Sequence, residues 1–475
     1  MSTLDLALVG GTVATSDGVS RRDIGVRDGK VAVIAAPGQL PPAVETINLR
    51  DQYVLPGLVD PHTHPGNFRS VCDDIPPETR SAAVGGVTTI VATVKSPRLV
   101  ASDQVESVGS YLDGFEAARE SIESAAHVDV AFSFVIMTAQ HAGEIPAYAE
   151  QCGVRSFKFF LLCPPISEWG RRVGMPVFPD EGTVFRGFQA CAETGSLAMV
   201  HAENRQITEA LAAAASADVS GVADWEARFP GMLEASEIRK AAVFSRLTGA
   251  PLYVVHVSSI EGLDAVDAAR HEGTAVIAET CPQYTTLSIE DHGDLGARVK
   301  FNPPIRYRRD AAALWEGLAS ERIQCVGSDH VPGDSGRDKQ LDQGVGRALP
   351  GSPGLATLLP LLWTHGVEPG RIGVQRLVAI ACTNPAKAFG LYPRKGELAP
   401  GSDADMVVID PGVRRTVRAS DLHSWANWTA YEGMELAGWP TLTLLRGAVV
   451  ARAGLPEGRA SGRYLARNRD GRRTN

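Results

Sequence analysis

The chain of 475 residues is 44% hydrophobic and 21% charged, as in a globular enzyme with ample length for a large core. Its net charge of −9 argues against a nucleic-acid or acidic-membrane partner, and no apolar run approaches the ~18 residues of a membrane span. The start lacks a basic segment before an apolar core, and the seven cysteines form no C-x-x-C pair, so we expect no secretory signal, free thiols and a cytoplasmic location.

Short strand patterns separated by turns occur at both ends of the chain. Residues 1–56 contain "LDLALVGGTVAT", "DIGVRDGKVAVIAA" and "ETINLRDQYVLPG", and residues 398–460 contain "SDADMVVIDP" and "TLTLLRGAVVARAG". We expect these two pieces to be the halves of one small β-sandwich domain built from both chain ends. The arginine-rich tail, residues 461–475, is expected to be disordered or to form a subunit contact.

Apolar runs alternate with helical, often alanine-rich segments in the middle of the chain, residues 57–397. Eight runs are typical of buried parallel strands: 57–65, 86–94, 127–137, 155–161, 197–204, 252–259, 274–280 and 323–331. Eight such units predict an α/β fold, a TIM-like (β/α)8 barrel. A flavodoxin-like open sheet is the alternative, but eight units exceed its usual count.

Polar residues stand at the C-terminal ends of these strands, where a barrel places its chemistry. The first strand ends in His62 and His64, which the alternation of side chains along a strand points to one face. Later strand ends carry His201, His256 and Asp329. A single strand histidine is more often a core residue, but four of the 11 histidines at strand ends favour a site for zinc or a similar divalent metal.

A lysine, Lys158, lies inside the apolar run "RSFKFFLLCPP". A buried ammonium is costly unless it becomes neutral or finds a strong partner. An ammonium would repel metal ions, whereas a neutral amine can react with carbon dioxide to give an anionic carbamate with two oxygens. The histidines favour this N6-carboxylysine as a bridge between two metals over a snorkelling or salt-bridged structural lysine.

Eight motifs run in order from Gly57 to Pro411: "GLVDPHTHP", "SFKFF", "VHAEN", "VHVSS", "ETCPQY", "NPPIR", "GSDH" and "NPAKAFGLYPRKGELAPGSDADMVVIDP". Together they resemble the cyclic amidohydrolases of the amidohydrolase superfamily, particularly the hydantoinase and dihydropyrimidinase branch. The resemblance implies a metal-dependent hydrolase that opens a C–N bond of a small cyclic amide, imide or ureide. It also implies a homotetramer or homodimer.

The resemblance further implies a binuclear metal centre holding zinc, with manganese, cobalt or iron as alternatives, and carbon dioxide or bicarbonate for lysine carboxylation. The first histidine pair and Asp329 would bind the more buried ion, and His201 and His256 the more exposed one. Carboxylated Lys158 would bridge the ions, with a hydroxide between them. Asp329 would be the catalytic residue that takes the proton of the hydroxide and delivers it to the leaving ring nitrogen.

The residues expected to bind substrate depart in part from the family pattern. Asn302 matches the position whose backbone holds the amide edge of the substrate. Cys163 stands where a tyrosine usually helps to hold the oxyanion, and a thiol is a poor donor. Tyr284 and His141 are candidate substitutes. The substrate loop is also altered, reading "LPGSPG" at residues 349–354.

These departures leave other functions open: an allantoinase, a hydrolase of another amide, urea or carbamate, or a non-catalytic scaffold. A dihydroorotase-like enzyme would have a carboxylate-binding arginine two residues after the histidine pair, where this chain has Gly66. Arg69 could reach an anionic substituent, although a surface role fits it better. Glu203 and His330 are candidates for supporting the metal ligands, with a buried structural role as an equal alternative.

Overall fold

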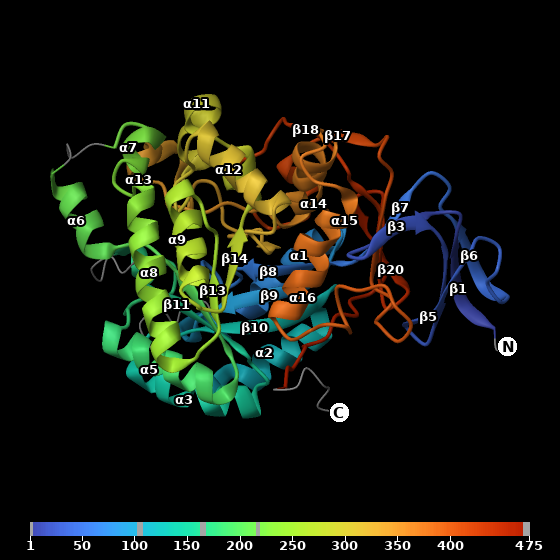
Figure 1. Ribbon diagram of the computed structural model, residues 1–475, viewed down its shortest axis with the longest axis horizontal. Coiled ribbons are helices and arrows are strands. Elements are labelled where there is room, and N and C mark those ends of the chain that lie inside the picture. Colours follow the sequence, from blue (N-terminus) through green and yellow to red (C-terminus); the bar gives the residue numbers. More distant parts are fainter. Residues whose placement is uncertain (1–2, 102–107, 162–167, 215–218, 469–475) are drawn as a thin grey trace.

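The computed structural model describes residues 3–101, 108–161, 168–214 and 219–468 (Figure 1). Its centre is a parallel sheet of eight strands that neighbour one another in sequence order. The strands are β8 (Leu58–Thr63), β9 (Val87–Val94), β10 (Asp129–Val135), β11 (Ser156–Phe160), β12 (Leu197–His201), β13 (Leu252–Val254), β14 (Val276–Thr280) and β15 (Cys325–Val326). A parallel bridge between Thr63 and His330 links the first strand to the segment after the last. The predicted (β/α)8 barrel is confirmed.

All eight barrel strands are shorter than the sequence predicted, and the two that are shortened most both end before a proposed metal ligand. β13 stops at Val254 and β15 at Val326, whereas the apolar patterns continue to residues 259 and 331. The backbone turns left-handed at His256 (φ 39°) and at Asp329 (φ 49°), which ends the extended conformation. Non-glycine residues in this region are strained, and such strain gathers at functional sites.

Helices follow the barrel strands and cover the outside of the barrel (Figure 1). The longer ones are α1 (Val71–Val84), α2 (Leu112–Ala125), α3 (Ala139–Gln151), α5 (Glu181–Thr194), α8 (Gly231–Thr248), α9 (Ile260–His271) and α12 (Arg308–Ala319). Side-chain caps set their starts: Ser70 accepts a hydrogen bond from the Asp73 N–H at 3.1 Å, and Ser259 from the Gly262 N–H at 3.0 Å.

The remaining helices are shorter and lie mostly in the loops after the strands. They are α4 (Glu168–Arg172), α6 (Arg205–Ala214), α7 (Val222–Glu226), α10 (Pro282–Thr286), α11 (Ile289–His292), α13 (Gly344–Arg347), α14 (Leu358–Leu362), α15 (Val374–Val378) and α16 (Asn384–Ala388). Two of them continue into π-helical turns, at residues 363–367 and 379–383.

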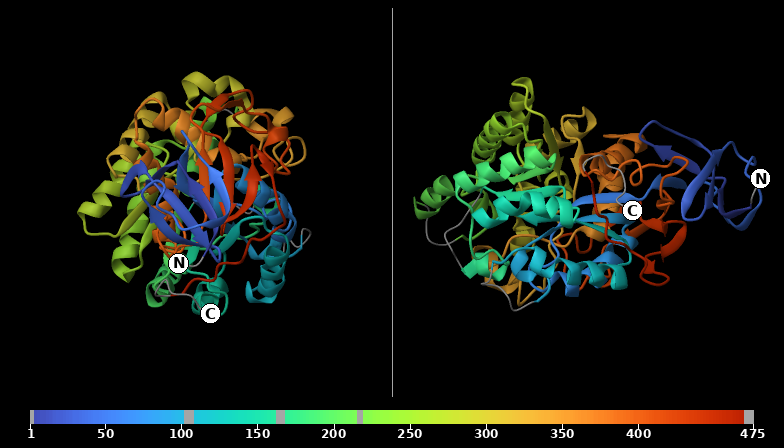
Figure 2. Two further views of the ribbon diagram at one scale, coloured as in Figure 1. Left: turned by 90° about the vertical axis from the view of Figure 1, so that its right-hand side faces the viewer. Right: turned by 90° about the horizontal axis from the view of Figure 1, so that it is seen from below.

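The chain ends form the second part of the fold, at the end of the molecule away from α8 (Figures 1 and 2). A four-stranded sheet has the order β5 (Lys30–Ala35), β4 (Asp23–Arg27), β1 (Leu4–Val9), β6 (Ala43–Asn48). A seven-stranded sheet has the order β21 (Leu455–Pro456), β20 (Ala448–Arg452), β19 (Pro440–Leu445), β16 (Met406–Ile409), β7 (Tyr53–Pro56), β2 (Thr12–Thr15), β3 (Gly18–Arg21). A separate pair consists of β17 (Arg414–Thr416) and β18 (Glu435–Ala437). Because β7 pairs antiparallel with β16, the second sheet joins both ends of the chain, as predicted.

A buried ionic cluster joins the barrel to the chain-end strands. Lys395 pairs with Asp129, Asp403 and Asp405, and Arg446 also pairs with Asp129. Although burial opposes it, the charges of the aspartates raise the pKa of Lys395 above its usual range. The three carboxylates are close enough to hold a metal ion, but Lys395 and Arg446 pair with them, and Lys30 and Arg394 pair with Asp403 as well, so the cluster is a structural joint.

Residues 461–468 of the C-terminal tail are not disordered, which was one of the two states expected of the tail. Val130 N–H donates to the Arg463 carbonyl at 2.9 Å, and Leu465 N–H donates to the Val130 carbonyl at 2.8 Å. Leu465 is 1% exposed, and buried Arg467 donates to Ser156 Oγ at 3.0 Å. This part of the tail therefore pairs with β10 of its own barrel. Residues 469–475 lie outside the described part.

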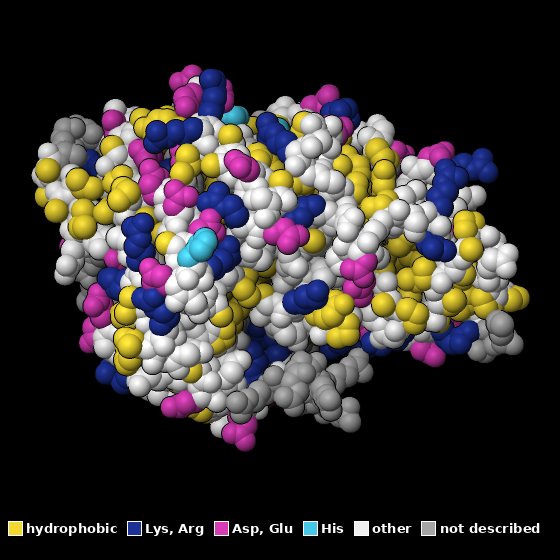
Figure 3. Space-filling model, in the orientation of Figure 1, with side chains coloured by type: hydrophobic (Ala, Val, Ile, Leu, Met, Phe, Trp, Pro, Cys, Tyr) yellow, Lys and Arg dark blue, Asp and Glu magenta, His cyan; other side chains and the backbone are white. Residues whose placement is uncertain are grey.

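The surface mixes charges of both signs. On the face drawn in Figure 3, lysine and arginine side chains alternate with aspartate and glutamate, with hydrophobic atoms between them. Within the described ranges, no helix is both long and apolar enough to cross a membrane. Six cysteines fall in these ranges, and all six are free.

Candidate metal centre and substrate cavity

The first group of predicted ligands meets at the end of β8. His62 Nε2 lies 3.0 Å from His64 Nε2, and the Asp329 carboxylate lies 3.1 Å from His64 Nε2 and 3.5 Å from His62 Nε2. The alternation along β8 points both imidazoles inward, as the sequence indicated. These three side chains can converge on one ion.

The second group lies beside the first. His201 Nδ1 at the end of β12 is 2.9 Å from His256 Nε2 after β13. The rings of His62 and His256 stack with centroids 5.6 Å apart, which places the two groups side by side. Lys158 Nζ, fully buried on β11, lies 3.1 Å from His62 Nε2. The six predicted ligands therefore come together at one mouth of the barrel.

The electrostatics suit cation binding. Burial lowers the pKa of His62 to about 3 and the pKa values of His64 and His256 well below their usual range, so these imidazoles are neutral at pH 7. Burial also lowers the pKa of Lys158 to about 8, against the charge of Asp329. Neutral imidazole nitrogens that face one another beside a carboxylate form a donor set that fits divalent metal ions.

Glu279, at the end of β14, supports both histidine groups and was not singled out from the sequence. Its carboxylate accepts hydrogen bonds from His62 Nδ1 at 2.9 Å, the Tyr253 hydroxyl at 2.8 Å and the His256 N–H at 3.2 Å. Gly327 gives it room, because a Cβ there would lie 3.0 Å from the carboxylate and from His62 Cβ, closer than ordinary van der Waals contact. The motif "ETCPQY" was the available signal, since Glu279 is a polar strand-end residue within it.

Other carboxylates fix the ligands from outside. Asp60 Oδ1 accepts hydrogen bonds from the His62 N–H and the Ser328 N–H, both at 3.1 Å, and so ties β8 to the segment that carries the aspartate ligand. Glu203 Oε2 lies 2.7 Å from His201 Nε2, leaving Nδ1 of this histidine toward the centre. A ligating histidine that is held through its other nitrogen is typical of protein metal sites.

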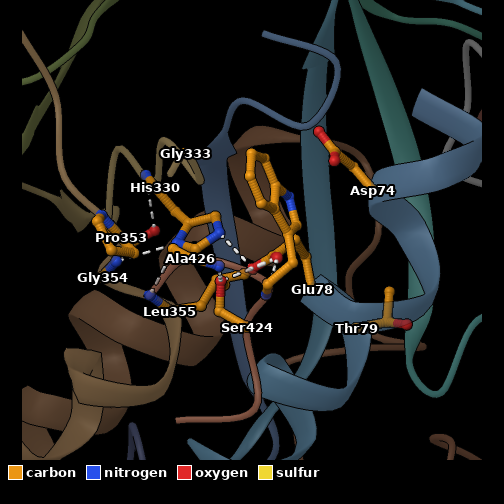
Figure 4. A network of polar contacts seen from close by, with 12 residues as sticks. Asp74, Glu78, Thr79, His330, Gly333, Pro353, Gly354, Leu355, Ser424 and Ala426 are labelled. Carbon is orange, nitrogen blue, oxygen red and sulfur yellow. Dashed lines mark hydrogen bonds and ion pairs between the residues drawn. The ribbon is translucent and has the colours of Figure 1, made fainter. Parts of the chain in front are cut away.

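His330 connects α1 with the substrate loop (Figure 4). Its Nδ1 accepts a hydrogen bond from the Gly354 N–H at 2.9 Å, so its Nε2 carries the proton and donates to Glu78 at 2.7 Å. The other oxygen of Glu78 accepts from the Ser424 hydroxyl at 2.9 Å. The His330 carbonyl accepts from the His64 N–H at 2.8 Å.

A cavity opens over the six ligands. Besides five of them it is lined by Asn67, Lys95, Phe160, Val173, Met175, Asn302, Val331, Pro350 and Gly351. Asn302, predicted to bind substrate, is among them, and its side-chain oxygen is buried without a protein partner. The altered loop 349–354 contributes two of its residues to this lining.

The predicted substitutes for the missing tyrosine lie elsewhere. The hydroxyl of Tyr284 donates to the Pro303 carbonyl at 2.8 Å, and Tyr284 does not line the cavity. His141 is a buried residue in the first turn of α3, and its Nε2 bonds to the Gly109 carbonyl at 2.9 Å. Cys163 falls outside the described residues. Arg69 pairs with Asp74 at 3.1 Å and stacks on a tryptophan, so its role is structural.

A barrel with such a donor set at its strand ends defines the class of barrel metallohydrolases. The Amidohydrolase family matches residues 53–450. The chain belongs to this family and, within it, to the cyclic amidohydrolases of the hydantoinase and dihydropyrimidinase branch, as the motifs indicated.

Three similar proteins cover nearly the whole chain. A D-hydantoinase of Streptomyces coelicolor is 36% identical over 462 residues, which is 93% of each chain. An allantoinase of Rubrobacter xylanophilus is 33% identical over 476 residues, 99% of each chain. The solved structure of an L-hydantoinase (dihydropyrimidinase) from Arthrobacter aurescens superposes with a TM-score of 0.88 at 32% identity, covering 97% of this chain and 99% of that one.

Proposed function

We propose that the chain is a metal-dependent hydrolase that opens the ring of a cyclic ureide, such as a hydantoin or dihydropyrimidine, at a C–N bond. The observation that carries this proposal is the convergence of four histidines, a buried lysine and an aspartate at one cavity, which Asn302 also lines. The similarity to hydantoinases of both stereochemical names supports the reaction class.

The six converging residues would hold two divalent ions, and zinc is our proposal because neutral imidazole and carboxylate are its usual ligands. When bound, such ions supply an activated water at neutral pH and polarise the substrate carbonyl. Carboxylation of Lys158 is part of the proposal. Its buried amine has a pKa lowered toward neutrality, so a reactive fraction of free amine exists, and a carbamate would turn a repelling cation into an anionic ligand.

The side chains of the protein have distinct tasks in ring opening. Asp329 lies at the edge of the cavity, 10% exposed, where its carboxylate can take up a proton and return it to the leaving ring nitrogen. The unpartnered Asn302 side-chain oxygen can accept a ring N–H. Phe160, Val173 and Met175 provide apolar walls for the faces of a flat ring and exclude water.

Allantoin is the second candidate substrate, because an allantoinase matches the chain over 99% of its length. Allantoin is itself a hydantoin with a ureido substituent, so the same cavity chemistry would serve both. A homotetramer or homodimer and a cytoplasmic location complete the proposal.

The test is a ring-opening assay of the purified, metal-loaded protein. The panel contains hydantoin, 5-substituted hydantoins, dihydrouracil, allantoin, succinimide and phthalimide, with an open-chain urea and a carbamate as controls. Turnover of one cyclic group and of neither control is the expected result. Turnover confined to the open-chain compounds, or turnover of no compound with both metals bound, would contradict the proposal.

A further inference from the structure

Lys95 is a second lysine of the cavity wall, and the metal centre does not use it. It follows the last residue of β9 and is 4% exposed, and its side chain lines the same cavity as His64 and Asp329. Its ammonium donates a hydrogen bond to the side-chain oxygen of Asn67, a buried residue of the loop after the histidine pair. Asn67 thus holds the ammonium at the cavity.

The ammonium of Lys95 has no counter-ion among the residues that the structure describes. Asn67 is its single hydrogen-bond partner there, although an ammonium offers three donors, and no described carboxylate lies within ion-pair distance. Burial, followed by the positive charge of Arg98, lowers the pKa of Lys95 to about 7, and Asp329 opposes this only in part. Buried charges normally have a partner, and the described residues offer this one no anion, so its remaining donors are free to bind an anion that enters the cavity.

The position of Lys95 in the barrel indicates which part of a bound substrate would contact it. Lys95 follows β9, the second barrel strand, whereas Asn302 follows β14, the seventh. The strands between them around the barrel, β8 and β15, lead to the histidine pair and to Asp329. A ring whose amide edge faces Asn302 would therefore lie over the metal ligands and extend a substituent toward Lys95.

We propose that Lys95, positioned by Asn67, binds a carboxylate on the ring substituent, so that the preferred substrate is a cyclic ureide carrying an anionic side chain. The inference rests on the proposed ring opening and adds its substrate class. Arg69, the anion-binding candidate of the sequence, is already paired with Asp74. Charge-assisted hydrogen bonds to a buried ammonium are strong enough to decide between an acid and its neutral isostere.

The test compares 5-carboxymethylhydantoin with its carboxamide isostere in the metal-loaded protein. We expect kcat/KM for the carboxylate to exceed that for the carboxamide by about 10- to 100-fold. Lys95→Met keeps an unbranched side chain that is one atom shorter and removes the charge, and it should reduce this preference to about one. Lys387→Met is the matched control, because Lys387 is exposed on α16, and it should keep the full preference.

Three results would overturn the inference: no preference in the unchanged protein, turnover of neutral rings only, or an equal loss on both rings in Lys95→Met. The last would mean that Lys95 only supports the loop after the histidine pair. If the protein opens neither ring, calorimetry with the same two compounds separates the two proposals. Tighter binding of the carboxylate that Lys95→Met abolishes would uphold the subsite and refute ring opening, whereas equal Kd values would refute the subsite.

Discussion

His330 Nε2 donates a 2.7 Å hydrogen bond to Glu78, and the backbone N–H of Gly354 donates to the other nitrogen of the same ring. One imidazole thus connects α1 with the loop that follows the substrate-lining residues 350 and 351. His330 also follows Asp329 directly, and its carbonyl accepts a hydrogen bond from the His64 N–H. It therefore fixes the metal-binding side and the substrate-binding side of the cavity relative to each other.

Glu78→Gln should destabilise the protein by about 1–3 kcal/mol. His330 Nε2, the Ser424 hydroxyl and the Trp425 N–H all donate to this carboxylate. An amide in its place turns its NH2 group toward one of these donors in either orientation. Chemical denaturation measures the loss, and Glu116→Gln on the exposed face of α2 is the control, expected to stay within about 0.5 kcal/mol. A similar small change in both variants would show that the network contributes nothing to stability.

Lys158→Ala should lose most of the bound metal and of the activity, with partial rescue by short carboxylic acids. The cavity left by the side chain lies next to His62, where a small carboxylate can replace the carbamate oxygens. Elemental analysis of the purified variant and ring-opening rates with and without added acetate measure the two effects. Lys387→Ala serves as the control. Full activity of Lys158→Ala would refute the carbamate bridge.

Asp329→Asn should leave the fold intact and lower kcat by about 10²- to 10⁴-fold, because an amide cannot relay a proton. Circular dichroism and metal content are measured beside kcat, since this residue is also a ligand. A variant with normal metal content and an unchanged kcat would assign the proton transfer to another group.

Glu279→Gln should weaken metal binding by about 10- to 100-fold. The carboxylate fixes His62 through Nδ1 and His256 through its N–H, and an amide can accept from only one side. Competition with a chelator gives the affinity. Tyr253→Phe removes one donor to the same carboxylate and leaves both histidine contacts, so a smaller effect is expected there. Equal affinities in all three proteins would exclude a role for Glu279 in holding the ligands.

The sequence predicted the parts of the site that depend on chain order and missed those that depend on pairing across the barrel. The strand ends followed from apolar patterns, which placed His62, His201 and Lys158 at one mouth. Glu279 lies 217 positions from its partner His62, and no local sequence pattern predicts such a pair. The sequence did not indicate a role for Lys95, because a lysine that follows a strand has the same local pattern whether it faces solvent or a cavity.

The C-terminal tail also shows that local sequence does not predict pairing with distant parts of the chain. Its arginine-rich composition is typical of a disordered segment or a subunit contact, yet Arg467 is buried and donates to Ser156, and Leu465 pairs with the backbone of β10. Composition describes side chains, whereas every residue except proline has the same hydrogen-bonding groups in its backbone. A free strand end can therefore receive a segment whose composition resembles a disordered tail.

Glu234→Gln should change how stability depends on pH. Burial raises the pKa of Glu234 from 4.5 to about 7, although Arg306 and the hydrogen bonds of Ser258 and Ser259 oppose the rise. In an unfolded chain the carboxyl ionises near 4.5, so its contribution to stability is present below that pH and is lost as the pH rises through 7. Glutamine does not titrate, so the variant does not lose this stability as the pH rises.

The free energy of unfolding of Glu234→Gln, relative to the unchanged protein, should thus rise by about 3 kcal/mol between pH 4.5 and 7. Denaturation of both proteins at several pH values gives the difference, in which the other titrating groups cancel. Glu290→Gln on the exposed helix α11 is the control and should show no such trend. A difference that stays constant over this range would mean that Glu234 ionises in the folded protein as it does in water, and that Arg306 neutralises it fully.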